Sequence, residues 1–241
     1  MKKILLGLLT SAALSAFIPD TAKPKTKLYV VAITGADLHE TPSFTSKIAR
    51  RLPLGVVVNA QQTVASDDVK WIGAGFALSG DWIEVTTPAY TGYIFSSDLT
   101  PRRPTIKKSR SGMLYIDLLG TTKSSRTEKQ LVASAAKNLL REYATKDITE
   151  YANGTYTMTT YDGCFDHVYA FRQLTLNEVY HHLISNYSGY DGKKLKQPKL
   201  LSKKGNVYTF TCGFGDSDAT QELQLTIHEK GILIISSSDC T

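Results

Sequence analysis

One stretch decides how the first half of the chain folds: GDWIEVTTPAYTGYIF, at residues 80–95. Apolar and polar residues alternate from Trp82 to Val85, as in a half-buried strand, and a second strand is predicted from Thr91 to Phe95. Within the first strand, Trp82 is expected to belong to the core rather than to a ligand platform. Tyr93 and Phe95 share one face of the second strand, and we expect that face to meet the core as well.

More short strands surround this stretch. Lys27–Ile33 is rich in residues that favour extended structure, and Val56–Val58 follows Gly55, which tolerates the positive φ of a turn. Between them, an extended piece ends in a turn at Pro42. Several short strands at close spacing, separated by Gly and Pro turns, predict a small β-barrel.

The order of these pieces resembles the bacterial SH3-like (SH3b) family over residues 28–100. Leu38, Pro42 and Ser43 agree with the family's opening motif, Leu-Asn-Val-Arg-Ser-Gly-Pro-Ser, whereas His39 replaces its Arg and Thr41 its Gly. Four later segments also resemble the family in the same order; they are Ser46–Ile48, Leu52–Gly55, the Gly-x-Trp-x-x-Val strand at Gly80–Val85 and the closing signature at Thr91–Leu99.

The resemblance implies a five- to seven-stranded barrel that binds peptides or cell-wall glycopeptides and serves as a targeting attachment beside another domain. Candidate ligand residues are the aromatics Trp71, Phe76 and Tyr90. The first two lie in the Gly-containing excursion Asn59–Gly80, where an aromatic ring can offer a large apolar contact area. The alternative is that Trp71 folds back over an open end of the barrel.

The N-terminus has the pattern of an export signal. Lys2 and Lys3 precede the uncharged apolar run Ile4–Ile18, and small residues at Ala13-Leu14-Ser15 offer a cleavage site. We therefore expect residues 1–22 to be a signal peptide with a short mature segment, and a periplasmic or secreted bacterial protein. It would meet the membrane only transiently, through this segment; the alternative is a retained N-terminal anchor.

Composition and charge limit the classes of partner that the protein is expected to bind. Hydrophobic residues make up 42% of the chain and charged residues 21%, as in an ordinary globular protein. The net charge of +6 falls to +4 without Lys2 and Lys3, an excess compatible with an anionic envelope polymer or membrane surface. Nucleic acid is not expected, because no Lys/Arg stripe is interleaved with aromatic residues.

The second half predicts an α+β domain of unrecognised family at residues 113–241, after a polar, Pro-containing linker at 101–112. We expect an antiparallel sheet with one or two covering helices. The helices are predicted at Thr127–Ala144 and Leu174–Ile184. The strands are predicted at Thr155–Tyr161, Phe165–Phe171, Asn206–Phe214, Glu222–His228 and Ile232–Ser237.

The three cysteines, Cys164, Cys212 and Cys240, permit one disulfide in an oxidising compartment. Cys240 lies next to the C-terminus, where a thiol has little packing value, so we expect it to be bridged. Cys212 lies on the aromatic face of a predicted strand and suits the role of a small hydrophobe. Cys164–Cys240 is the preferred bridge, and pairings with Cys212 stay open.

No catalytic residue, metal ligand or cofactor site is predicted. Cys164 with His167 or His228 suggests a peptidase, but Cys164 sits in a predicted turn and not at the start of a helix, where the known envelope peptidases carry it. Glu178 and His182 share a helical face without a His-Glu-x-x-His motif. A calcium site at Asp216 and Asp218 lacks further oxygen ligands.

The sequence thus favours a binding protein over an enzyme. The leading hypothesis is an exported envelope-binding or adaptor protein whose SH3-like module recognises a cell-wall glycopeptide or a peptide of an envelope protein. One alternative is an envelope hydrolase with a Cys/His peptidase-like site in the second domain. The other is a non-catalytic component of an envelope protein assembly.

Overall fold

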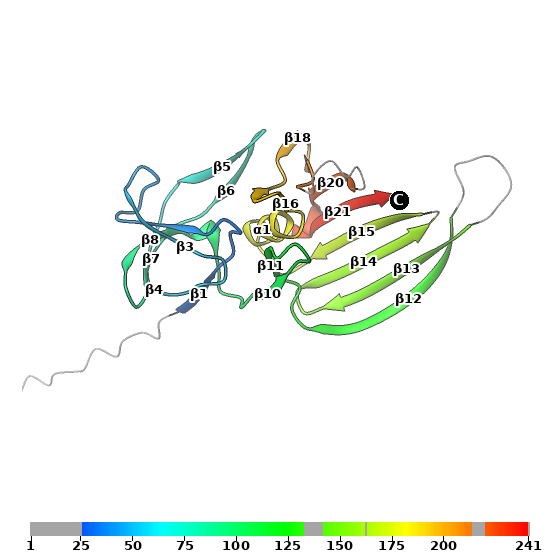
Figure 1. Cartoon of the computed structure of the whole chain (residues 1–241), viewed down its shortest axis with the longest axis horizontal. Coiled ribbons are helices and arrows are strands. Elements are labelled where there is room, and N and C mark those ends of the chain that lie inside the picture. Colours follow the sequence, from blue (N-terminus) through cyan, green and yellow to red (C-terminus); the bar gives the residue numbers. More distant parts are fainter. Residues whose placement is uncertain (1–25, 133–141, 162, 214–219, 241) are drawn as a thin grey trace, which may run out of the picture.

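The computed structural model describes residues 26–132, 142–161, 163–213 and 220–240. As predicted, an all-β unit is followed by an α+β unit, and the α-helix α1 (Leu176–Asn186) lies between their sheets (Figure 1). The expected signal peptide, residues 1–22, falls outside the described residues.

The first unit is a curled antiparallel sheet of order β3-β2-β8-β7-β4-β1-β9. It is open: its edge strands β3 and β9 are not paired with each other in the described part of the chain. The strands are β1 (Thr26–Val30), β2 (Ala36–His39), β3 (Ile48–Leu52), β4 (Val57–Val64), β7 (Trp82–Thr86), β8 (Thr91–Phe95) and β9 (Leu99–Thr100), which follows the 3-10 turn η1 (Ser96–Asp98).

The two faces of the β7–β8 ladder have different roles. Ile83 pairs with Ile94, and both join the apolar core enclosed by the curled sheet. Trp82 pairs with Phe95 on the opposite face, outside that core. The prediction that Trp82 is buried is confirmed, since it is 1% exposed. The prediction that the face of Tyr93 and Phe95 is buried holds for Phe95, which is 2% exposed beside Trp82, whereas Tyr93 is half-buried.

Two hairpins extend from the first unit. β5 (Val69–Gly73) and β6 (Phe76–Ser79) form the first, within the excursion Asn59–Gly80. β10 (Thr105–Lys108) and β11 (Leu114–Asp117) form the second, so part of the predicted linker is a strand. The turn of this second hairpin holds Gly112, whose φ of +86° suits glycine.

The second unit is an antiparallel sheet of order β12-β13-β14-β15-β21-β20-β19-β18. Its strands are β12 (Thr122–Val132), β13 (Glu142–Tyr151), β14 (Gly154–Tyr161), β15 (Cys164–Phe171), β18 (Leu200–Lys204), β19 (Val207–Phe210), β20 (Thr220–Ile227) and β21 (Leu233–Cys240). The hairpin of β16 (Gly189–Asp191) and β17 (Lys194–Lys196) follows α1, and the short turn η2 (Glu229–Gly231) precedes β21.

The prediction of a helix at Thr127–Ala144 is wrong at both of its described ends. Its described ends belong to β12 and β13, which pair with Thr127 opposite Asp147 and Arg126 opposite Ile148. The four-residue spacing of Leu131, Ala135 and Leu139 suggested an amphipathic helix, but residues 133–141 lie outside the described residues. Pairing with the rest of the sheet overrode the local preference at both ends.

The helix predicted at Leu174–Ile184 is confirmed as α1. A capping box starts it: Glu178 N donates to Thr175 Oγ1 at 3.2 Å, and Thr175 N donates to the Glu178 carboxylate at 2.8 Å. Val179 and Leu183 are fully buried in the core beneath the helix. The helix therefore covers the middle of the second sheet, which is the α+β arrangement expected.

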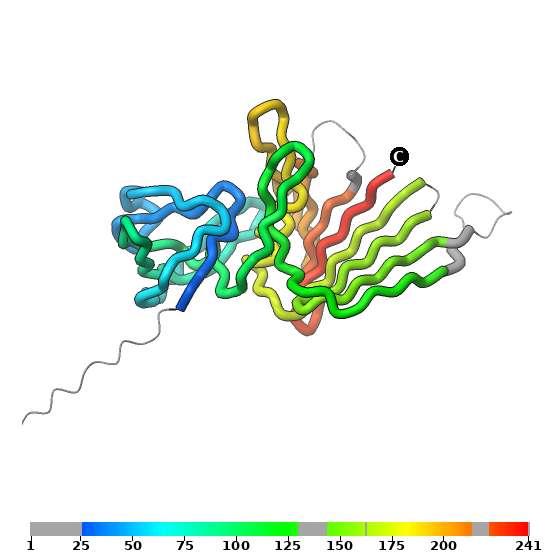
Figure 2. The backbone as a smooth tube through the Cα atoms, turned by 60° about the horizontal axis from the view of Figure 1, so that its bottom comes forward, coloured from blue at the N-terminus to red at the C-terminus, as the bar shows by residue number. Residues whose placement is uncertain are grey.

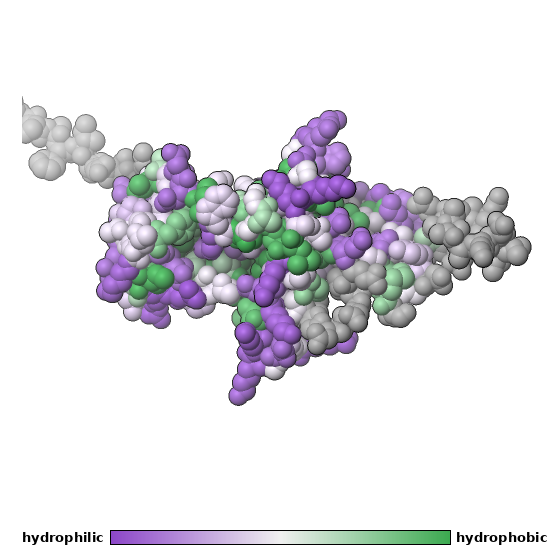
Figure 3. Space-filling view, turned by 90° about the horizontal axis from the view of Figure 1, so that it is seen from above, coloured by the Kyte–Doolittle hydropathy of each residue, from purple (hydrophilic) through white to green (hydrophobic). Residues whose placement is uncertain are grey.

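The two units share one apolar core. Phe76 and Leu78 of the β5–β6 hairpin belong to the same buried cluster as residues of α1 and of the second sheet. The Phe76 ring lies 4.7 Å from that of Tyr208 and 5.6 Å from that of Tyr180. Apolar residues accordingly gather at the middle of the molecule, while hydrophilic residues cover its projections (Figure 3).

Cys164 and Cys240 form a disulfide, as preferred from the sequence. They are paired residues on the neighbouring strands β15 and β21, with Cα atoms 4.1 Å apart. Cys212 is a free, half-buried thiol. The bond is compatible with an oxidising, exported location.

Removing the bridge should destabilise the second unit, because it closes a loop of 76 residues. We expect the double variant Cys164→Ala/Cys240→Ala to lose about 2–4 kcal/mol of unfolding free energy in urea denaturation. Reductant should lower the stability of the wild type and of the control Cys212→Ala, and leave the double variant unchanged. Equal sensitivity of all three proteins to reductant would contradict the assignment.

His182 gives stability a predictable pH dependence. Burial in α1 lowers the pKa of this imidazole to about 4, and its Nδ1 accepts a hydrogen bond from Leu118 N at 3.3 Å. Between pH 6.5 and 4 this histidine is protonated in the unfolded chain but not in the native state. The free energy of unfolding therefore falls as the pH falls through this window. Urea denaturation should show a shallower fall in His182→Gln, which does not titrate; parallel pH profiles would count against this cause.

Candidate functional site

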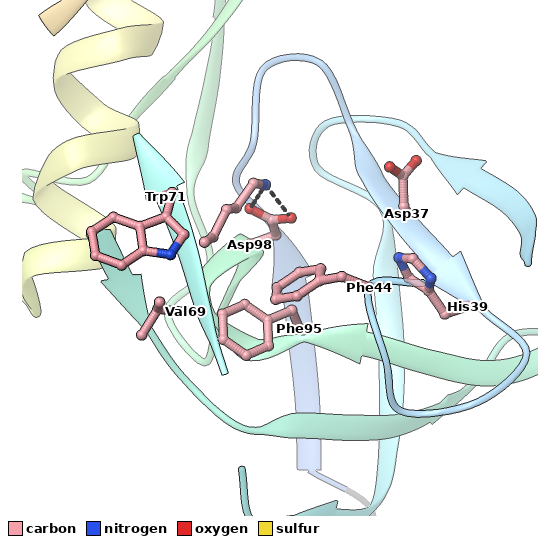
Figure 4. Close-up of a pocket in the computed structure, with 8 residues that line it drawn as sticks. Asp37, His39, Phe44, Val69, Trp71, Phe95 and Asp98 are labelled. Atoms are coloured by element: carbon pink, nitrogen blue, oxygen red, sulfur yellow. Dashed lines mark hydrogen bonds and ion pairs between the residues drawn. The ribbon is translucent and has the colours of Figure 1, made fainter. Parts of the chain in front are cut away.

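An open groove of about 230 Å³ lies on the outer face of the first sheet (Figure 4). Phe44 and Phe95 occupy its middle, with Val69 and Trp71 of β5 on one side and Asp37 and His39 of β2 on the other (Figure 4). Lys70 of β5 and Asp98 of η1 complete its lining. Its walls therefore come from the hairpin β5–β6, from β2 and the loop after it, and from the end of β8.

The floor of the groove is a packed aromatic cluster. The Phe44 ring lies 4.8 Å from Phe95 and 4.9 Å from Trp82, and the His39 ring meets Trp82 edge-on at 5.1 Å. Trp82 Nε1 donates to an Asp68 carboxylate oxygen at 2.7 Å, which fixes the indole. Because the cluster is held from several sides, it offers a preformed apolar surface.

An ion pair lies at the edge of this surface. Lys70 Nζ donates to both carboxylate oxygens of Asp98 at 2.8 Å, and His181 Nε2 lies 3.3 Å from the same carboxylate. Burial alone would raise the pKa of Asp98, but the contacts with His181 and Lys70 outweigh it and hold that pKa below its ordinary value. Asp98 is therefore an anion at neutral pH, shared between the groove and helix α1.

The structure brings one of the three predicted ligand residues into this groove. Trp71 lines it and is 72% exposed, so it does not fold back over the sheet. Phe76 is 2% exposed in the core shared by the two units, which corrects its prediction as a ligand contact. Tyr90 is 39% exposed but lies outside the groove, where its hydroxyl accepts from Arg50 Nη1 at 2.9 Å.

Sequence reasoning missed Phe44, Phe95, His39 and the Lys70–Asp98 pair. Phe44 carried a usable signal, since it is an aromatic residue directly after the turn at Pro42-Ser43, and it is 42% exposed. The pairing of Lys70 with Asp98 joins residues 28 positions apart and has no local signature. Such contacts depend on how η1 and β5 meet in three dimensions.

The Cys/His peptidase candidate loses its nucleophile. Cys164 is bonded to Cys240, and His167, three positions along β15, points to the opposite face of the strand. His167 instead contacts the Tyr156 hydroxyl at 2.7 Å and the Asp239 carboxylate at 3.3 Å. His228 is exposed, beside the carbonyl oxygen of Glu229.

The residues considered as metal ligands in the sequence also have other partners. Glu178 accepts a hydrogen bond from the Thr100 hydroxyl, and His182 faces Leu118 N. Among the described residues, no three His, Cys, Asp or Glu side chains are grouped so as to hold a metal ion. Asp216 and Asp218 fall outside those residues.

Comparison with protein-family models, with curated proteins and with solved structures gave no significant match for this chain. In the part of the chain that the structure describes, no helix has the length and apolarity needed to span a membrane.

Truncation of Phe76 should lower the free energy of unfolding much more than truncation of Trp71. Phe76→Ala leaves a cavity in the shared core, so we expect a loss of about 3–5 kcal/mol in unfolding free energy. Trp71→Ala removes an exposed side chain and should change that free energy by about 0.5 kcal/mol or less. Urea denaturation of both variants measures the difference; similar losses would mean that Trp71 is packed against the protein.

Proposed function

We propose that this chain is an exported envelope-binding protein whose first unit is an SH3-like module. The aromatic groove, defined by Phe44, Trp71 and Phe95 with the Lys70–Asp98 pair, holds a peptide or the peptide part of a cell-wall glycopeptide. The observation that carries the proposal is Trp71, a large aromatic side chain left 72% exposed beside a packed aromatic floor. Exposed aromatics of this kind are the usual anchors of recognition surfaces.

The shape of the groove favours a chain lying along the surface. Its volume of about 230 Å³ is smaller than that of pockets that enclose a drug-sized molecule, so it accommodates one or two side chains of a longer ligand. Lys70, whose side chain is 39% exposed, presents a positive charge at its edge above the buried Asp98. Stem peptides of cell walls and peptides of envelope proteins carry carboxylate groups that match such a charge.

Export is part of the same proposal. The charged start and apolar run of residues 1–22 support it, and so does the disulfide Cys164–Cys240, which suits an oxidising compartment. A Cys/His hydrolase is not proposed, because Cys164 has no free thiol.

A role as an assembly component is the second candidate. All side chains of β14 and nearly all of β15 are half-buried, so neither face of these strands is completely covered. A sheet covered this incompletely can accept another protein on its surface. Cross-linking in cells that recovers a stable protein complex, with no binding to cell wall, would favour this candidate over the first.

Binding to the cell wall tests the proposal. Purified protein should cosediment with peptidoglycan sacculi, and isothermal titration with soluble stem peptides should show about tenfold weaker binding for Trp71→Ala and for Phe44→Ala. Tyr90→Ala is the matched control, because Tyr90 is an exposed aromatic outside the groove. Absence of binding, or equal affinity in all variants, would reject the groove as the site.

A further inference from the structure

A second, larger groove lies where the two units meet, and it shares no lining residue with the aromatic groove. It consists of two adjoining hollows of about 430 and 610 Å³ that have Thr34 and Leu195 in common. The first hollow lies between the turns of the first sheet and the hairpins β10–β11 and β16–β17. These two hairpins project next to each other from the middle of the molecule (Figure 2).

Apolar and polar groups share the lining of the first hollow. Its apolar part includes Ile33, Leu54 and Met113, from the first unit and the β10–β11 hairpin. Leu114 and Tyr190 stand at its sides and are 49% and 44% exposed. Exposed apolar side chains that line a hollow provide contact area for the apolar side chains of a partner.

The second hollow is basic. Lys194, Lys196 and Lys199 line it, and among its described lining residues Asp191 is the one acid. Asp191 is already paired with Lys196 at 3.0 Å. In the described part of the chain, Lys194 and Lys199 are exposed and have no acidic partner within ion-pair distance. Among the described residues, the charges of Lys194 and Lys199 are therefore unpaired, beside the apolar side chains of the first hollow.

We propose that this groove binds an extended, acidic segment of another polypeptide in which Asp or Glu residues are interspersed with apolar ones. The acidic side chains pair with Lys194 and Lys199, and the apolar ones lie between Leu114 and Tyr190. Both units and both hairpins supply the lining, so the site exists only in the whole chain. Charge complementarity of this kind speeds association and selects the partner.

Concavity favours a polypeptide over a membrane. Lys199 and Leu195 line the hollows, where a narrow chain reaches them. A flat bilayer surface meets the tips of the hairpins first, where Lys194 follows the β16–β17 turn, and leaves the floor of the hollows out of contact.

The test uses an immobilised library of ten-residue peptides in which Asp or Glu alternates with Leu, Val, Phe or Tyr, probed with the purified protein. Peptides of the library should bind to the protein, and higher salt should weaken this binding. The double variant Lys194→Glu/Lys199→Glu should bind at least about tenfold more weakly. The matched control is Lys123→Glu/Lys129→Glu, which makes the same change of net charge on exposed positions of β12 and should bind as the wild type does.

Three outcomes would overturn the proposal. One is that no library member binds at low salt. Another is that the β12 control loses as much affinity as the groove variant, because net charge alone would then explain binding. The third is that the protein ignores the peptides and binds vesicles of phosphatidylglycerol and phosphatidylcholine. Trp71→Ala should keep full affinity for the acidic peptides, so failure of the aromatic groove and failure of this one are distinguishable.

Discussion

Phe76 and Leu78 leave the first sheet on the β5–β6 hairpin and enter the core of the second unit, and this packing constrains the rest of the structure. It buries an aromatic ring against Tyr180 and Tyr208, which is the largest kind of apolar contribution a single side chain makes. Because the hairpin is anchored from its β6 side, β5 is held in place, and Trp71 on β5 stays exposed beside the aromatic floor. The groove is thus positioned by a contact outside it.

Polar contacts reinforce the same junction. Asp98 follows β8 and reaches both Lys70 at the groove and His181 of α1, while Asn177 Nδ2 donates to Ser79 O at 2.8 Å. Buried charges are costly unless they are paired, and here each partner comes from a different element. The ion pair at the edge of the aromatic groove therefore depends on the docking of α1.

The larger groove has the same origin. Its lining combines turns of the first sheet with the β16–β17 hairpin, which follows α1 directly. Leu54 of the first unit and Leu195 of β17 line the same hollow because the two units are docked. Two surfaces of different chemistry, one aromatic and one basic, arise from one interface.

The sequence by itself determined the short strands of the first unit, the buried position of Trp82, helix α1 and the preferred disulfide. The strands and the helix rest on the spacing of apolar residues and on glycine and proline turns, which act over a few residues. The preference for the disulfide rests on the place of each cysteine in its own segment, although the bond joins residues 76 positions apart. Tertiary structure alone decided that Phe76 is core while Trp71 is surface, that residues 127–132 form a strand, and that Lys70 meets Asp98. In each case the deciding contact comes from a residue distant in the sequence, and local propensity does not indicate such a contact.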